Sequence, residues 1–171
     1  ESLTKYSGYQ LLQIKMRGFR DPIDLKCLSD CPHLLGFSLQ DGFLTRIRGI
    51  EFCSMLSEID FFDSDLSQAD LSILGQLFNL TSLEMMGCML DEDASLGCSE
   101  SLREVYLVGV EGLIDLRMLE GIRLTKFIAR NCSLRSLNGL CAENLELLDV
   151  ERNRIQDLEP LREAEKLETM F

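Results

Sequence analysis

Several features are missing from this sequence, and each absence excludes a class of protein. No apolar run reaches the roughly 18 residues that a membrane-spanning helix needs, so no such span is indicated. Residues 1–10 contain no apolar segment of the kind found in signal peptides. They also contain no initiator methionine, and we therefore expect the chain to be part of a longer protein.

The cysteine spacing of a disulfide framework is missing too. The seven cysteines are an odd number and include no CxxC pair. Several of them fall at positions that the repeat pattern described below directs inward. This usage favours reduced, buried thiols, and with them an intracellular, cytoplasmic setting.

Basic residues are absent from the middle of the chain. Residues 51–100 contain 11 Asp and Glu side chains and no Lys or Arg, so nearly all of the net charge of −12 lies there. The flanking segments, residues 1–50 and 101–171, carry net charges of +2 and −3. We expect no direct binding to the phosphate backbone of nucleic acids, and we favour a basic protein as partner.

The stretch from Leu148 to Met170 carries a repeat pattern, LxLxxNxIxxLxxLxx. Leu148 and Val150 alternate as in a half-buried strand, and apolar or small residues then recur at every third position. The pattern closes on itself, because Met170 stands 22 residues after Leu148. A unit this short cannot bury its own apolar face, so it needs copies stacked on either side.

Six earlier stretches match the same pattern. The predicted strands start near Leu12, Phe37, Ile59, Leu83, Val105, Phe127 and Leu148. These starts lie 25, 22, 24, 22, 22 and 21 residues apart. We therefore predict a single repeat domain over residues 1–171, with an atypical N-terminal segment at residues 1–10 and a truncated eighth repeat at Met170.

The pattern resembles the leucine-rich-repeat family, in the short-repeat subclass of phosphatase-regulator-like proteins and bacterial internalins. The resemblance implies an α/β fold: a right-handed solenoid with a curved parallel β-sheet on its concave face. Its convex face would hold 3-10 turns, loops or short helices, and we expect a helical turn near residues 68–78. In the family, the sixth residue of each repeat, counted from the first strand residue, is usually Asn, and its side chain bonds backbone groups of neighbouring turns. Here only the last repeat has Asn at position six, namely Asn153. We therefore expect irregular curvature, especially near Val110.

The predicted register also defines a candidate binding site on the concave face of the third to fifth repeats. Carboxylates there surround exposed apolar and aromatic side chains, as in many protein interfaces. The members are Asp60, Phe62, Asp63, Glu84, Met86, Tyr106 and Val108. The alternative is a solubilising acidic belt with a few exposed apolar residues.

The sequence contains only weak matches to metal-binding and catalytic motifs. The acidic run from Asp91 to Asp93 lacks the Gly and Glu spacing of a calcium loop, so a solvated acidic loop is the default. Cys27, Cys31 and His33 lie close in sequence, but no second pair completes a zinc site and no third group orients a catalytic dyad. We expect no catalytic residues, no metal and no cofactor.

The sequence thus predicts a non-enzymatic scaffold that binds a protein partner through its concave face. Two alternatives stay open. One is an assembly module that stacks through an open C-terminal end, which further repeats, another domain or another subunit would cover. The other is a regulatory or targeting domain of a larger enzyme.

Overall fold

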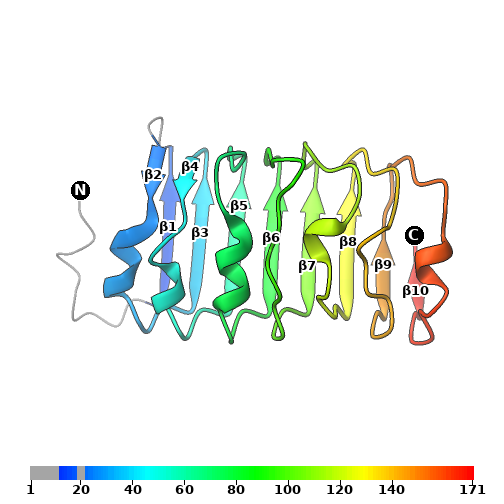
Figure 1. Cartoon of the computed structure of the whole chain (residues 1–171). Helices are drawn as coiled ribbons and strands as arrows, with labels where there is room; N and C mark the ends of the chain where they lie inside the picture. The colour runs from blue at the N-terminus through cyan, green and yellow to red at the C-terminus, as the bar shows by residue number, and fades with distance from the viewer. Residues whose placement is uncertain (1–11, 19–21) are drawn as a thin grey trace.

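The structure is a computed structural model that describes residues 12–18 and 22–171. Eight parallel strands form one sheet in chain order (Figure 1). They are β1 (Gln13–Arg17), β3 (Gly36–Gln40), β5 (Glu58–Phe62), β6 (Ser82–Met86), β7 (Glu104–Val108), β8 (Lys126–Arg130), β9 (Leu147–Asp149) and β10 (Thr169–Met170). The predicted segment 1–10 lies outside the described residues.

In-register pairing of equivalent apolar residues builds this sheet. The predicted strand starts Phe37, Ile59, Leu83, Val105, Phe127 and Leu148 pair in one continuous row across the strands. Met170 pairs with Leu148 at the far end, as the closing of the repeat predicts. The register is therefore confirmed from the second strand to the last.

The first strand departs from the prediction. Ile14 pairs with Phe37 and Met16 with Leu39, so the inward residues are Ile14 and Met16 rather than Leu12 and Ile14. Leu12 is 54% exposed. Apolar residues at 12, 14 and 16 allow two registers with the same inward face, and packing against the next coil selects the later one. Arg17 consequently lies on the solvent side of β1, not at position six.

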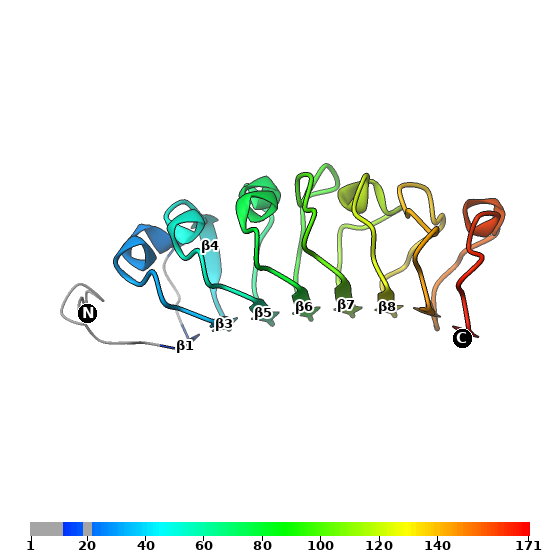
Figure 2. The same cartoon turned by 90° about the horizontal axis from the view of Figure 1, so that it is seen from below.

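The opposite layer consists of 3-10 helices and loops. The helices are η2 (Leu25–Asp30), η3 (Ile50–Phe52), η4 (Leu71–Gln76), η5 (Arg117–Leu119) and η6 (Glu159–Leu161). A second, two-stranded parallel sheet joins β2 (Pro22–Asp24) and β4 (Phe43–Arg46). Figure 2 shows the strands along the concave side and the helices along the convex side. The helical turn expected near residues 68–78 is η4.

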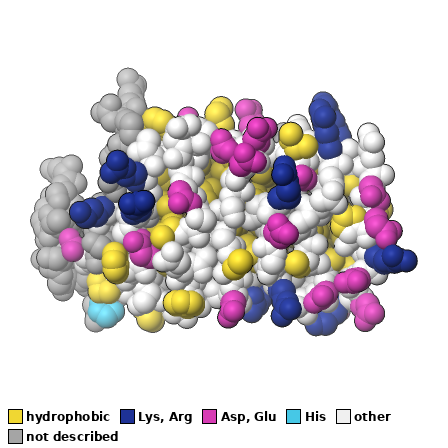
Figure 3. All heavy atoms as spheres, viewed as in Figure 1, with side chains coloured by type: hydrophobic (Ala, Val, Ile, Leu, Met, Phe, Trp, Pro, Cys, Tyr) yellow, Lys and Arg dark blue, Asp and Glu magenta, His cyan; other side chains and the backbone are white. Residues whose placement is uncertain are grey.

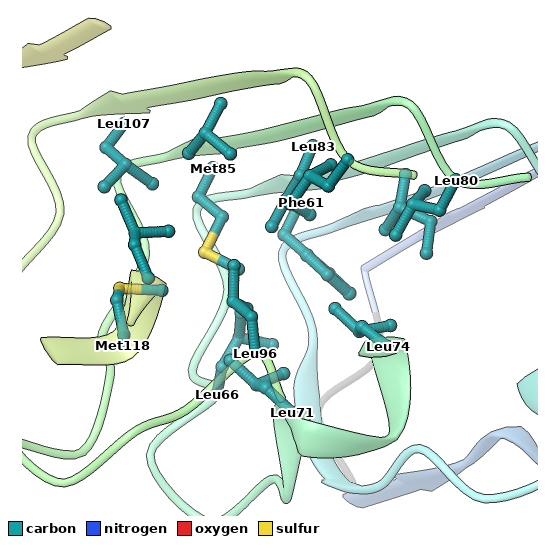
Figure 4. Packing of buried hydrophobic residues seen from close by; sticks show 14 of the residues in the cluster. Phe61, Leu66, Leu71, Leu74, Leu80, Leu83, Met85, Leu96, Leu107 and Met118 are labelled. Carbon is teal, nitrogen blue, oxygen red and sulfur yellow. The ribbon is translucent and has the colours of Figure 1, made fainter. Parts of the chain in front are cut away.

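The core lies between these two layers. The every-third series from Leu44 to Ile59 and from Leu71 to Leu83 are buried throughout, as predicted. In Figure 4, Phe61, Leu83 and Met85 from the strands point toward side chains of the convex segments, among them Leu74 and Leu96. Each coil therefore buries apolar surface against its neighbours as well as within itself.

Where Asn is missing at position six, main-chain bridges join the coils, and Ser64 Oγ also accepts the backbone N–H of Gly42 at 3.2 Å. Asn153 Oδ1 accepts hydrogen bonds from the backbone N–H groups of Cys132 and Leu134, at 3.0 and 3.1 Å. In the earlier coils, bridges between main-chain groups join Phe43, Asp65, Met89 and Glu111 in succession. The coil containing Val110 stays paired in register on both sides. The irregular curvature expected near Val110 stays a prediction, because in-register pairing is compatible with it.

Six cysteine side chains are described, and none of these six is in a disulfide. Cys31, Cys53, Cys88 and Cys132 are buried, whereas Cys98 is exposed and Cys141 is half-buried. Burial raises the pKa of the Cys88 thiol to about 11. Because the thiolate is the reactive form, burial and this raised pKa both protect Cys88.

We expect a thiol-reactive probe at neutral pH to label Cys98 rapidly in the native protein and the buried cysteines only after unfolding. Peptide mapping by mass spectrometry at successive labelling times measures each site. Labelling of Cys88 at the rate of Cys98 would show that this part of the core is open.

Candidate functional site

The concave face of the sheet carries three rows of solvent-side residues, because strand side chains alternate between the core and the outside. We name the rows by their place along the strands. The first row is Gln13, Gly36, Glu58, Ser82, Glu104, Lys126, Leu147 and Thr169. The middle row is Lys15, Ser38, Asp60, Glu84, Tyr106, Ile128 and Asp149. The last row is Arg17, Gln40, Phe62, Met86, Val108 and Arg130.

Six of the seven predicted site residues come together in these rows. Asp60, Glu84 and Tyr106 are consecutive in the middle row, on β5, β6 and β7. Phe62, Met86 and Val108 are consecutive in the last row, on the same three strands. All six are half-buried or exposed, which leaves them accessible to a partner.

The seventh residue, Asp63, lies apart from the rows. It turns away from the end of β5 with a positive φ of 47°. Its carboxylate lies over Gly87, where an added Cβ would come within 2.5 Å of Asp63 Oδ1. Gly87, with a φ of 62°, therefore allows the Asp63 side chain to lie at the rim beside Met86.

The first row adds residues that the sequence prediction missed. Each strand from β3 to β8 begins one residue before its predicted start, so Glu58, Glu104 and Lys126 also face the concave side. Extending the alternation by one residue in the N-terminal direction would have found them. The acidic cluster thereby grows to four carboxylates: Glu58, Asp60, Glu84 and Glu104.

On β5 and β6, few basic side chains offset the negative charge of the acidic cluster. Desolvation raises the pKa of the Asp60 carboxyl, the charge of Glu58 raises it further, and Lys15 opposes the shift. Desolvation also raises the pKa of Glu84, to which the charge of Asp60 adds. Asp60 and Glu84 pair directly across two strands about 4.8 Å apart. The charged forms of Asp60 and Glu84 are therefore less favourable than those of isolated carboxyls, and a nearby cation would stabilise them.

The side chain of Tyr106 contacts one acidic and one basic residue of the first row. Its hydroxyl donates a short hydrogen bond to Glu104, and Lys126 Nζ lies 4.9 Å from the centre of its ring. This distance is within the range of a cation–π contact. The edge of the acidic cluster at β7 and β8 thus already holds a cation.

The side chain of Asp149 is buried, contrary to the exposure predicted from the alternation of Leu148 and Val150. The alternation directs its side chain to the solvent side, yet Asp149 is only 1% exposed. Arg130 Nε donates to Asp149 Oδ2 at 2.8 Å, and the backbone N–H of Glu151 donates to Oδ1 at 3.2 Å. The hydrogen bond from Arg130 lowers the pKa of Asp149, and the backbone bond from Glu151 adds to this shift. Glu151 is exposed, as predicted.

The described part of the chain brings together no set of metal ligands. Among the described residues, no three His, Cys, Asp or Glu side chains are placed to hold a metal ion. The Cys27 side chain, part of the weak zinc pattern, lies outside the described set. The acidic loop at Asp91–Asp93 is exposed, and the Asp91 carboxylate accepts the backbone N–H of Asp93, as in a tight turn.

The convex face differs in character from the concave one. In Figure 3, which views the convex side, Lys and Arg side chains are interspersed with Asp and Glu. On the concave face the charges separate into blocks: basic on β1, acidic on β5 to β7 and basic on β8. This separation distinguishes the concave face as the candidate site.

Comparison with solved structures decides the fold. An internalin (inlF) from Listeria monocytogenes superposes with a TM-score of 0.55 and 18% identity. The fold is a leucine-rich-repeat solenoid. The match covers 91% of this chain but only 46% of the internalin chain, so this solenoid spans about half the length of that protein. No protein-family profile and no curated protein matches the sequence.

Within residues 12–18 and 22–171, no helix has the length and apolar character to cross a bilayer.

We expect Asp149→Ala to lower the free energy of unfolding by about 1–3 kcal/mol at neutral pH, because the Glu151 N–H and the Arg130 guanidinium lose their acceptor. The folded-state pKa of Asp149 is depressed. Its contribution is therefore present above the unfolded pKa, near 4, and is lost as the pH falls through the lower, folded value.

Urea unfolding at pH 7 and at about pH 2.5 tests this, since the difference between wild type and variant should shrink at the lower pH. Glu151→Ala, the exposed neighbour, is the control and should be near neutral. A near-neutral Asp149→Ala would mean that the ion pair of Asp149 with Arg130 contributes nothing.

Proposed function

We propose that this chain is a non-enzymatic scaffold that binds a basic protein partner on its concave face, over β5, β6 and β7. One observation carries the proposal: the like-charged pair of Asp60 and Glu84, opposed by Lys15 alone, lies beside the half-exposed Phe62 and Met86. Carboxylates supply attraction and orientation, whereas aromatic and Met side chains supply burial.

Energetics favour a binding role over a passive acidic belt. Like charges on adjacent strands destabilise the free protein, since they repel at short range in a partly desolvated setting. A belt that only improved solubility would be served by fully exposed acids spread over the surface. Placing Asp60 and Glu84 side by side on the sheet disfavours the free state, and a cationic partner would relieve that repulsion.

A neutralised variant tests the site. Asp60→Asn/Glu84→Gln should weaken binding of a partner purified from cells by at least tenfold, about 1.4 kcal/mol. Raising the ionic strength from about 0.05 to about 0.5 M should also weaken wild-type binding, because salt screens exposed charges. Isothermal titration calorimetry measures both effects.

The matched control is Glu92→Gln/Asp93→Asn, which removes the same two charges from the exposed loop after β6. It should retain the affinity of the wild type. Equal weakening by both variants would reduce the effect to overall charge, and no weakening by either would place the site elsewhere.

A second candidate function, assembly through the C-terminal coil, has its own support. Val150, Ile155 and Leu167 are only half-buried, although the equivalent residues of inner coils are fully buried. Leu158 is 51% exposed and Phe171 65% exposed beside the open edge of β10. An apolar end with an unpaired strand edge favours association with a second copy of the chain.

Sedimentation velocity over a range of protein concentrations checks this candidate. We expect concentration-dependent association that Leu158→Asp abolishes. Phe78→Asp, at an exposed apolar residue four coils away, should not change it. A monomer at every concentration would contradict assembly through this end.

A further inference from the structure

We propose that the partner binds as a short amphipathic helix that lies across β5, β6 and β7, with cations on one flank and apolar residues on the other. This inference rests on the proposed function and specifies the partner's form. Its basis is the division of the concave face along the strand direction. The first and middle rows supply Glu58, Asp60, Glu84 and Glu104, whereas the last row supplies Phe62, Met86 and Val108.

The spacing of the rows fits a helix. Successive solvent-side residues of a strand lie about 6.6 Å apart, so the first and last rows are separated by about 13 Å. An α-helix with its side chains is about 10–12 Å wide. A helix lying across the strands therefore reaches the acidic rows with one flank and the apolar row with the other. A single extended strand is narrower and would cover one row at a time.

The flanking cations limit the length of the partner's basic flank. From β5 to β7 the acidic block spans two strand spacings, about 10 Å. Lys126 and Arg130 on β8 border it directly, and Lys15 and Arg17 on β1 border it beyond the neutral β3. Two helical turns cover about 11 Å. The block accordingly accommodates three cations spaced at i, i+4 and i+7, and a fourth would approach Lys126.

Lys126 acts as an internal example of the contact. Its ammonium group lies over the Tyr106 ring, whose hydroxyl bonds Glu104. On β5 and β6 the acids have no such cation among the described residues: the only basic group that opposes the raised pKa of Asp60 is Lys15, two strands away.

A hollow between β1, β3 and β5 is lined in part by Glu58, Asp60 and Lys15. The two carboxylates outnumber the one cation, so the hollow favours the end of one long basic side chain. A partner's cation placed there reaches Glu58 and Asp60, which lack the neighbouring cation that Lys126 supplies at β7.

Designed peptides test the helix directly. The first is a helix of about 18 residues with three Lys at i, i+4 and i+7 on one flank and Leu on the adjoining flank. The second has the same composition in scrambled order. Fluorescence anisotropy should give an affinity at least tenfold higher for the segregated peptide. Glu84→Gln/Glu104→Gln and Met86→Ser should each reduce it at least fivefold, whereas Glu92→Gln/Asp93→Asn should not.

A third peptide, with a fourth Lys at i+11, tests the limit set by β8. Wild-type protein should bind it no more tightly than the three-Lys peptide. Lys126→Glu extends the acidic block by one strand and should make the four-Lys peptide bind several-fold more tightly than the three-Lys peptide. Equal affinities for segregated and scrambled peptides, or no effect of Lys126→Glu, would overturn the inference.

These outcomes separate the inference from the proposed function. If Asp60→Asn/Glu84→Gln loses the cellular partner but the peptides show no order preference, the face binds a partner in another form. If neither the partner nor any peptide responds to changes on the face, both proposals fail.

Discussion

Stacking of equivalent apolar residues in one parallel register is the constraint on which this molecule depends. Phe37, Ile59 and Leu83 each lie against their counterpart in the next coil, and none could be buried by its own coil alone. A shift of one residue in any coil would turn the buried set outward. Because the register is fixed from the core side, the solvent side of every strand is fixed with it.

That coupling explains why the concave face can tolerate unfavourable contacts. The row of buried partners holds Asp60 beside Glu84 regardless of their mutual repulsion, since moving either would expose a core residue. Burial of the core residues thus offsets the repulsion between Asp60 and Glu84, and the two carboxylates stay side by side where a partner can bind them. The separation of acidic and apolar rows on β5 to β7 is a direct product of this geometry.

The sequence predicted what depends on periodicity and missed what depends on three-dimensional contacts. Alternation and the every-third series located the strands from Phe37 onward and brought six of the seven proposed site residues together. Apolar residues at 12, 14 and 16 left the first register ambiguous, and only packing on Phe37 resolves it. The burial of Asp149 depends on Arg130, 19 residues earlier, and no local pattern signals that pair.

The main-chain bridges from Phe43 to Glu111 mean that a position without a hydrogen-bonding side chain does not interrupt the solenoid. A solenoid that relies on an asparagine ladder needs the same side chain in every repeat. Here main-chain bridges join the second to fifth coils, and the side chains of Ser64 and Cys88 add bonds to the preceding coil. Position six therefore holds Gly42 and Val110, whose side chains form no hydrogen bond, without loss of pairing. Asn153 lies beyond the bridges, and its side chain joins its coil to the preceding one.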